Sequence, residues 1–254
     1  MDRKKLREAL SPKPVKFPSL EYVRQLTDSI KIETEIDQRD RALISFLFSS
    51  GMRDKAVATL PLGCFDRETL EIQQDPRAGV DTKFGKLNVS TLFRFDERLV
   101  EYVLEWAEYL EKTKLFAPTD PMFPRNRVEQ IEGGLTFVSR RIEPIFWKGT
   151  GSIRDILKRR SAEAGLDYYC PHSFRHGAAH LAMKHCRNAE EMKAISQNFG
   201  HETVGTTLYT YGKLDIHQVR EIIGKIDFSA SDKMIDREEA KVMLRKLERI
   251  IGRP

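Results

Sequence analysis

Cysteine is scarce in this chain, with three residues among 254. Cys64, Cys170 and Cys186 are odd in number and lack the spacing of a disulfide framework, which indicates a reducing compartment and predicts ordinary small apolar roles. Long apolar runs are also missing, since the most apolar segment, 42–48, is far too short to cross a bilayer. The N-terminal residues MDRKKLREAL lack the apolar stretch of a secretory leader. These absences predict a soluble, cytoplasmic protein that makes no membrane contact.

Charge of one sign is not strongly dominant either. The chain has 43 Lys plus Arg against 38 Asp plus Glu, a formal net charge of +5. Such an excess suits a polyanion such as nucleic acid, but many proteins without a polyanion partner share it. The length is enough to bury a core without disulfides or a metal. Composition alone therefore leaves the function open.

The pattern along the chain divides it into three parts. Residues 1–18 are basic and proline-rich, which predicts an extended linker. Residues 19–228 form the expected main domain, and residues 229–254 form a C-terminal helical tail. An apolar stripe on that tail needs a partner, which is either its own domain or a neighbouring protomer. The stripe consists of Ala240, Met243, Leu244, Leu247 and Ile251.

Helical patterns dominate the main domain. Ser19 predicts the N-cap of a helix that runs to about Ile30, and Asp37 predicts the cap of a second, core-facing helix. Broken, alternating runs between Leu70 and Thr91 predict a small antiparallel sheet, the only convincing β region. A long helix over 96–112, a loop-rich stretch over 116–134 and four or five helices over 151–226 are expected to follow. The sequence thus predicts a mainly helical α+β domain.

One group of residues has the chemistry needed to hold and attack a phosphate. His172 and Arg175 are three residues apart at the start of a predicted helix, where both can face one site and the helix N-terminus favours an anion. Arg53 ends an earlier helix, and Gly200-His201 and Tyr211 follow downstream. Taken singly each residue is a weak signal, because a lone His-x-x-Arg is usually a surface pair and Arg53 can be a helix-end cation. Together, two arginines, two histidines, a tyrosine and a hairpin lysine match phosphate chemistry.

The order of these residues resembles the active-site signature of tyrosine recombinases of the phage integrase family. The strings SSGMRD, TKFGK, PHSFRH and SQNFGHETVGTTLYTYGKL match it closely. The resemblance covers the chain from about Pro12 to about Ile226. It implies the catalytic domain of a DNA recombinase or integrase of a mobile element, with a mainly helical α+β fold, a small antiparallel sheet and a C-terminal helix. It also implies double-stranded DNA as partner, a homo-tetramer on two recombination sites, and no metal or other cofactor.

The resemblance also implies a role for each matched residue. Tyr211 would attack the scissile phosphorus and leave a 3′-phosphotyrosine. Tyr209 is the alternative nucleophile, but it lies only eight residues after His201, whereas Tyr211 lies ten after it. In the family pattern Arg53 and Arg175 would clamp the non-bridging oxygens, and Lys83 would protonate the leaving 5′ oxygen, with Lys86 as second candidate. His172 would act as base or hydrogen-bond partner as the tyrosine loses its proton, and His201 would donate a hydrogen bond to a non-bridging oxygen.

The chain departs from the family pattern at Ala56, where many recombinases carry an acid three residues after the first arginine. Asp54 is then the residue expected to orient Arg53. Further DNA contacts are expected from backbone phosphates, chiefly along a basic helix over 152–160. The residues expected to touch DNA are Lys86, Lys148, Arg154, Lys158, Arg159 and Arg160.

Three other interpretations remain open on the sequence. His172, His176 and His180 recur every four residues and can place ligands on a metal, although no third-ligand motif lies nearby. A type IB topoisomerase uses similar tyrosine chemistry. A DNA-binding regulatory protein can keep the fold without recombining DNA. Relatives carry a helical DNA-clamping domain before the catalytic one, so we expect this chain alone to bind DNA weakly and in a salt-sensitive way.

Overall fold

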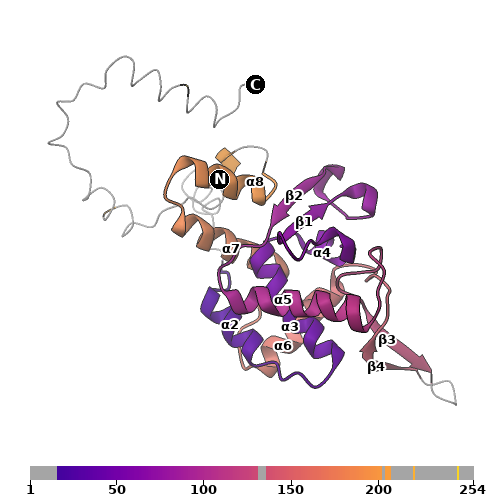
Figure 1. Cartoon of the computed structure of the whole chain (residues 1–254). Coiled ribbons are helices and arrows are strands. Elements are labelled where there is room, and N and C mark those ends of the chain that lie inside the picture. The colour runs from indigo at the N-terminus through magenta and orange to yellow at the C-terminus, as the bar shows by residue number, and fades with distance from the viewer. Residues whose placement is uncertain (1–15, 131–135, 202–203, 207–219, 221–244, 246–254) are drawn as a thin grey trace, which may run out of the picture.

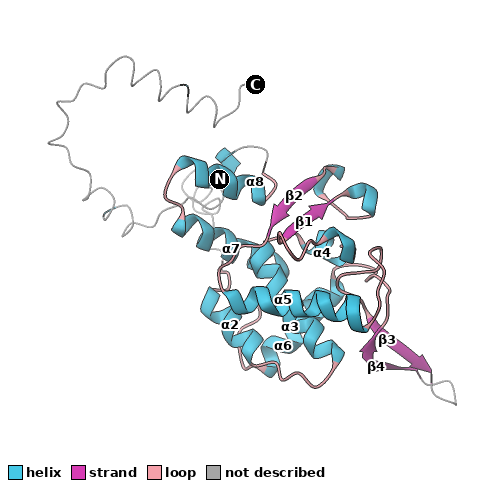
Figure 2. Ribbon diagram, viewed as in Figure 1, coloured by secondary structure: helices cyan, strands magenta, loops and turns pink. Residues whose placement is uncertain are grey.

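The computed structural model describes residues 16–130, 136–201 and 204–206, together with residues 220 and 245. Within these ranges the expected mainly helical α+β architecture is confirmed (Figure 2). No helix of the described ranges is both long and apolar enough to span a membrane. The helices are α2 (Leu20–Asp28), α3 (Glu35–Ser50), α4 (Asp54–Ala58), α5 (Glu97–Glu108), α6 (Gly151–Glu163), α7 (Pro171–His185) and α8 (Ala189–Asn198), and the strands are β1 (Glu71–Gln74), β2 (Asn88–Thr91), β3 (Asn126–Gln130) and β4 (Thr136–Ile142).

Helix α3 is the centre of the core. Its residues from Ala42 to Ser50 are all buried, and it packs against α2, α5 and α7 (Figure 1). The helix begins with a capping box, in which the Thr34 hydroxyl accepts from the Asp37 amide and the Asp37 carboxylate accepts from the Thr34 amide. The prediction that Asp37 is the N-cap was therefore wrong by three residues, because both ends of this reciprocal pair have capping side chains.

The other predicted helix starts are confirmed, and two helix ends differ. The Ser19 hydroxyl caps α2 by accepting from the Tyr22 amide, and α2 ends at Asp28 rather than near Ile30. Asp96 caps α5, whose regular turns end at Glu108 and continue as a wider π-type turn over Tyr109–Thr113. The spacing of apolar residues could not distinguish the π-type turn from an α-helical turn, because over a single turn both keep the same side of the helix buried.

Among the described residues there are two antiparallel hairpins rather than one. Strands β1 and β2 pair from Glu71 with Thr91 to Gln74 with Asn88, which confirms the predicted sheet. Strands β3 and β4 form a second hairpin, of which β3 lies in the stretch predicted to be loop-rich and β4 directly after it, so the prediction of a single β region was wrong. Their sequences, NRVEQ and TFVSRRI, are rich in polar and charged residues, which hides them from a test of apolar alternation.

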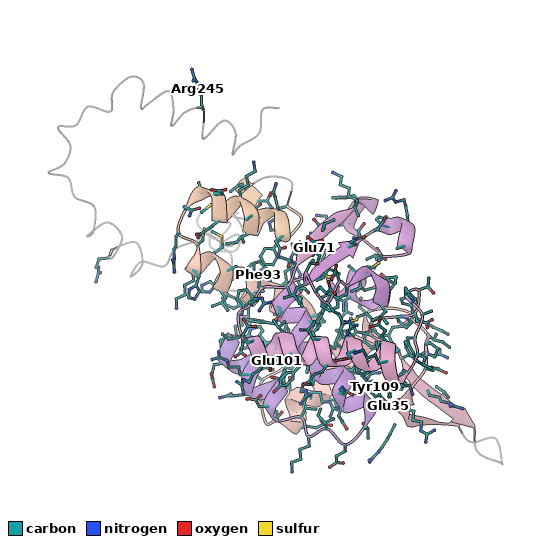
Figure 3. The ribbon with its side chains drawn as sticks, viewed as in Figure 1. Glu35, Glu71, Phe93, Glu101, Tyr109 and Arg245 are labelled. Carbon is teal, nitrogen blue, oxygen red and sulfur yellow. The ribbon has the colours of Figure 1, made fainter. Side chains whose placement is uncertain are left out.

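The second hairpin is tied to the core by Glu35 at the start of α3. One carboxylate oxygen of Glu35 accepts from the Ile142 amide of β4 at 2.9 Å. The other accepts from the Tyr109 hydroxyl at 3.1 Å, and these two side chains lie together in Figure 3. Burial and the hydrogen bond to Glu35 raise the pKa of Tyr109 to about 12. Tyr109 is thus held as a neutral donor, and β4 is fixed against the helical core.

A buried charged cluster joins α3 to α6. Asp40 is fully buried and accepts hydrogen bonds from Arg39 at 2.7 Å, Arg159 at 2.6 Å and Arg160 at 2.9 Å. Arg160 also donates to Asp37 at 2.6 Å. Buried charges are tolerated where each one is paired and hydrogen-bonded, as here. We call Asp40, Asp37 and these three arginines the Asp40 cluster.

Candidate active site

Arg175 connects three separate parts of the site. Its side chain comes from the first turns of α7 and is 4% exposed. One terminal nitrogen donates to the carbonyl of Gly51 at 2.6 Å. The other donates to the carbonyl of Phe199 at 2.7 Å and lies 3.1 Å from Nε2 of His201. The guanidinium thus holds the C-terminal turns of α3 and α8 together, in addition to carrying charge.

The two turns joined by Arg175 come close because each contains a glycine with a left-handed backbone. Gly51 has φ of 58° and ends α3, and a Cβ there would collide with the Phe199 ring. Gly200 has φ of 65° and ends α8, and a Cβ there would lie about 3.1 Å from the Asn88 side chain. Both positions favour glycine, because in any other residue the positive φ is sterically unfavourable and the Cβ would contact a neighbouring side chain. The glycines place Arg53 and His201, which follow within two residues, at one site.

His201 is neutral in this environment. Burial, together with the charges of Arg175, Arg53 and Lys83, lowers its pKa to about 4. A guanidinium nitrogen can only donate, so Nε2 of His201 accepts from Arg175 and the ring proton is on Nδ1. The hydrogen bond that His201 was predicted to donate would therefore come from Nδ1. Arg175, Arg53 and Lys83, which the sequence assigned to the same site as His201, are therefore near enough to lower the pKa of this histidine.

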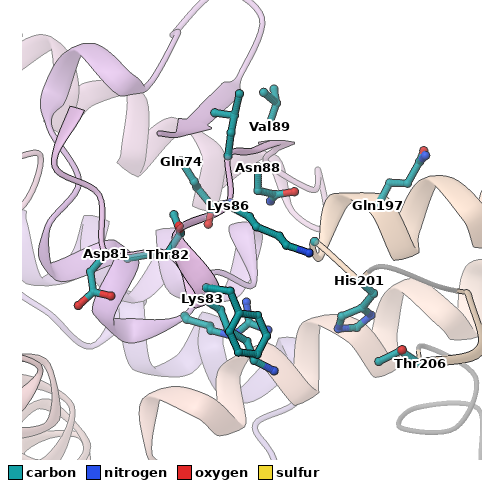
Figure 4. Close-up of a pocket in the computed structure, with 15 residues that line it drawn as sticks. Gln74, Asp81, Thr82, Lys83, Lys86, Asn88, Val89, Gln197, His201 and Thr206 are labelled. Carbon is teal, nitrogen blue, oxygen red and sulfur yellow. The ribbon is translucent and has the colours of Figure 1, made fainter. Parts of the chain in front are cut away.

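A pocket of about 620 Å³ lies between these turns and the β1–β2 hairpin. Arg53, Lys83, Lys86 and His201 all line it. Figure 4 shows the two lysines reaching from the hairpin side toward the side where His201 lies. These four residues are far apart in the sequence and were grouped there only because their motifs match one family signature. In the structure they line one cavity. Of the two lysines, Lys83 is the one whose charge contributes to the lowered pKa of His201.

Asn198 fixes the hairpin to the histidine turn, a contact that the sequence reasoning missed. The Asn198 side-chain oxygen accepts from the Thr91 amide at 2.7 Å, and its side-chain nitrogen donates to the Thr91 carbonyl at 3.0 Å. This two-bond contact joins the last residue of α8 to the last residue of β2. No signal in a single sequence identifies it, because an asparagine near a helix end normally indicates only a cap.

Arg53 is the half-buried cation of the pocket, and its surroundings differ from the prediction. No carboxylate pairs with its guanidinium in the described part of the chain. Asp54, which was expected to orient Arg53, instead lies 3.7 Å from Arg154 of α6 and accepts from the Lys55 amide. Ala56, at the position of the expected acid, is buried and lines the pocket. The Arg53 guanidinium therefore meets the pocket without a competing anion beside it.

His172 lies at the exposed start of α7, as its motif predicts. Partial burial and the charge of Arg175 lower its pKa, Asp54 raises it, and Arg53 lowers it again. Its ring is in edge contact with His176 at 4.6 Å, whereas the ring of His180 lies 4.9 Å from that of Phe17. Across residues 16–130, 136–201 and 204–206, no three His, Cys, Asp or Glu side chains are grouped to hold a metal. The alternative histidine–metal site thus has no support from the described residues.

The predicted DNA-contacting residues divide by exposure. Arg154, Lys158 and Lys148 are exposed, and so is Lys86 on the hairpin. Arg160 differs from the prediction, because it is 8% exposed and belongs to the Asp40 cluster. Arg159 is partly exposed but also donates to Asp40. A helix has a buried face and an exposed face, and the number of basic residues in the sequence does not show which of them lie on the exposed face.

Three predictions lie outside the described residues. These are the nucleophile Tyr211, its alternative Tyr209 and the C-terminal tail of residues 229–254, of which the structure describes residue 245 alone. The linker predicted over residues 1–18 is described only from residue 16, where Pro18 is buried and its carbonyl lies against Gly177 of α7.

Residues 19–218 match the phage integrase family. The chain belongs to this family. Among curated relatives, the tyrosine recombinase XerC of Lactobacillus delbrueckii is 24% identical over 201 residues, which cover 77% of this chain and 59% of the relative. The tyrosine recombinase XerD of Xanthomonas campestris is 28% identical over 192 residues, which cover 71% and 50%. The chain therefore spans little more than half the length of these relatives.

Solved structures show the same fold. The XerA recombinase matches with a TM-score of 0.57 at 20% identity, over 86% of this chain and 67% of XerA. The XerH site-specific recombinase, solved bound to its difH substrate, matches with a TM-score of 0.51 at 18% identity, over 85% of this chain and 56% of XerH. The fold is that of recombinases.

Proposed function

We propose that this chain is the catalytic domain of a site-specific tyrosine recombinase that cleaves and rejoins strands of duplex DNA. The observation that carries the proposal is the convergence of Arg53, Lys83 and His201 on one pocket, with Arg175 buried against His201. These residues come from four separate parts of a chain that belongs to the phage integrase family. An array of fixed cationic and hydrogen-bonding groups is what a phosphoryl transition state requires.

The proposed reaction exchanges one ester for another. The Tyr211 oxygen bonds to the scissile phosphorus while the bond from phosphorus to the 5′ oxygen breaks, which leaves a 3′-phosphotyrosine. The tyrosine proton passes to His172, and Lys83 supplies a proton to the departing 5′ oxygen. Attack by a 5′ hydroxyl reverses these steps and rejoins the strand. The number of ester bonds is unchanged, so no external energy source is needed.

Positive charge at the phosphate is shared unequally in this proposal. Arg53 lines the pocket, which supports the proposal that it contacts a non-bridging oxygen directly. Arg175 already donates to two carbonyls, so its part is to hold the two turns and to add charge behind His201. His201 then donates from Nδ1 to a non-bridging oxygen. The preorganised donors cost little rearrangement when charge builds up on the phosphate.

Double-stranded DNA is the proposed partner, and four protomers on two sites are the proposed assembly. The solved complex of XerH with its difH substrate supports DNA as the substrate class for a chain of this fold. The exposed cations Lys86, Arg154 and Lys158 are proposed to contact backbone phosphates, so binding should weaken steeply with salt. The proposed site of action is cellular DNA in the cytoplasm.

A pool of nicked duplexes with randomised arms tests the proposal. Cleavage beside the nick releases a short fragment, which traps the covalent intermediate on a denaturing gel, and sequencing of the trapped DNA reveals the preferred site. We expect an adduct with the wild type and with Tyr209→Phe, and none with Tyr211→Phe. An adduct lost only in Tyr209→Phe would reassign the nucleophile. A folded protein that binds DNA but forms no adduct would overturn the catalytic proposal.

Strand exchange is tested separately from cleavage. The trapped sequence is placed in two duplexes of different length, and recombinant products are resolved by size. Products that combine the two duplexes are expected. Adduct formation with relaxation of supercoiled DNA, but without any exchange, would indicate topoisomerase chemistry instead.

A further inference from the structure

Phe84 is an exposed aromatic ring at the turn between β1 and β2. It is 78% exposed, while the neighbouring apolar residues Leu87 and Val89 are 54% and 51% exposed. The Nζ of Lys83 lies 4.8 Å from the centre of the Phe84 ring, so a cation covers one face of the ring. The ring lines the same pocket as Arg53 and His201.

Neither packing nor backbone geometry accounts for this residue. Exposing a phenylalanine ring to water forgoes most of the stabilisation that its burial would give. Phe84 also has φ of 63°, a left-handed conformation that is sterically unfavourable for any residue with a Cβ. The neighbouring Gly85 adopts the same left-handed conformation, with φ of 62°, without any side chain. The backbone of the turn therefore does not require an aromatic ring. Such a doubly unfavourable residue is characteristic of a contact with a ligand.

The charges around Phe84 indicate the chemistry of that ligand. Lys83, Lys86 and Arg53 line the same pocket as the ring. A hydrophobic protein surface would have to desolvate these cations, whereas a nucleic acid neutralises them with its phosphates. Beside a phosphate held in the pocket, the nearest flat apolar surface of DNA is the base of the adjoining nucleotide. Aromatic side chains stack on bases or wedge between base steps, and phenylalanine is among the residues that do so.

We propose that Phe84 stacks on the base next to the phosphate held in the pocket and opens that base step. The proposal rests on the proposed function, because it takes a DNA phosphate as the occupant of the pocket. The base lies on the face of the ring opposite Lys83, and the cation on the other face leaves Lys83 directed into the pocket. Phe84 then contributes to which base steps the enzyme accepts, since pyrimidine–purine steps open most easily.

Tryptophan fluorescence on the full chain tests the stacking. Trp106 and Trp147 are buried and give a constant background, so Phe84→Trp reports on the turn. Gln73→Trp serves as the matched control, because Gln73 is exposed on β1 of the same hairpin and does not line the pocket. With short duplex DNA at low salt, we expect emission from the Phe84→Trp protein to fall by about half through base stacking. Emission from the Gln73→Trp protein should remain nearly unchanged. Equal quenching at both positions, or no quenching at Phe84→Trp when DNA is bound, would overturn the proposal.

Affinity provides a second test that needs no catalysis. Phe84→Ala should weaken binding of the same duplex roughly ten-fold, and Gln73→Ala, outside the pocket, by less than two-fold. An equal, small effect of both changes would contradict base stacking. If Phe84→Ala instead changes the molecular size of the DNA-free protein, the ring is a self-association surface and the proposal fails. Wild-type protein that binds no duplex at all would overturn the proposed function, whereas failure of these Phe84 tests alone leaves the proposed function standing.

Discussion

The two walls of the pocket are built in different ways. The wall that carries Arg53 and His201 rests on buried helices and is held by the hydrogen bonds of Arg175. The wall that carries Lys83 is a two-stranded hairpin in which turn residues 83–87 are exposed. Asn198 joins the end of this hairpin to the end of α8, and the Asp81 amide before the exposed turn donates to the Thr59 hydroxyl at 2.8 Å. One wall is therefore fixed by the core, and the other is attached by hydrogen bonds on either side of an exposed turn.

This difference separates two chemical tasks. Stabilising charge on a phosphate needs donors that are fixed before the substrate arrives, because reorganising them would cost part of the stabilisation. Protonating a leaving oxygen needs a donor that reaches the oxygen only when DNA is in place. The fixed wall suits the first task, and the exposed hairpin suits the second. The following predictions test this division, from the largest effect to the smallest.

Removing charge from the fixed wall should cost most. Arg53→Ala is expected to slow strand cleavage about a thousand-fold without unfolding the domain, because Arg53 lines the pocket and is only half-buried. Arg175→Ala should slow cleavage and also lower the unfolding temperature, since two buried hydrogen bonds are lost. Adduct formation and thermal denaturation measured on both variants check this. Equal destabilisation by both changes would show that Arg53 is structural.

Removing the proton donor from the hairpin wall should cost about a hundred-fold in cleavage. Lys83→Ala is expected to show this loss, and a substrate with sulfur at the bridging 5′ position should restore the rate, because a thiolate leaves without a proton. Lys86→Ala is the matched control on the same hairpin, with a smaller loss and no selective rescue. Selective rescue of Lys86→Ala instead would exchange the roles of the two lysines.

The buried histidine of the fixed wall should make stability depend on pH. The pKa of His201 is about 4 in the folded protein and near its ordinary value of 6.5 in the unfolded chain. The unfolded chain therefore binds more protons between these values, so stability is lost as the pH falls from 6.5 toward 4. The loss from this residue is on the order of 2 kcal/mol. His172 and His176 shift in the same direction, so the difference between wild type and His201→Asn in urea denaturation isolates the effect; parallel curves would contradict it.

Loosening the attachment between the two walls should cost about ten-fold in the cleavage step. Asn198→Ala removes both hydrogen bonds to Thr91, and we expect a lower rate at saturating DNA with little change in affinity. Asn188→Ala is the matched control, because it removes the N-cap of the same helix without touching β2. Equal effects of the two changes would indicate a general loss of α8 stability.

The smallest effects are expected on the helix outside the pocket. Arg154→Ala and Lys158→Ala should each reduce the salt dependence of DNA binding by about one phosphate contact. Lys112→Ala removes the same charge after α5 and should leave the slope unchanged. An unchanged slope in Lys158→Ala would remove that residue from the DNA surface.

The sequence predicted the parts of the fold that depend on apolar spacing and caps. Ser19, Asp96 and the 70–91 sheet were found where the pattern placed them. The β3–β4 hairpin was missed because its strands are polar and are held by a distant carboxylate, Glu35. Long-range contacts of this kind leave no local pattern.

The site was predicted as a set of residues but not as an arrangement. Motif order correctly grouped Arg53, Lys83 and His201, which line one pocket. Motif order could not show that Arg175 donates to the carbonyls of Gly51 and Phe199, or that Arg160 is buried. Both facts depend on which face of a helix meets the core. The role of Tyr211 stays a prediction.

The Asp40 cluster restricts how this domain can change during evolution. Three arginines converge on one fully buried carboxylate, so replacing Asp40 alone would leave the buried guanidinium groups of Arg39 and Arg160 without their shared partner. Replacing one arginine leaves the others paired and is tolerated more easily. Substitutions at these positions should therefore be accepted in a set order, arginines before aspartate, and Asp40 should vary only in lineages that have already lost the arginines around it.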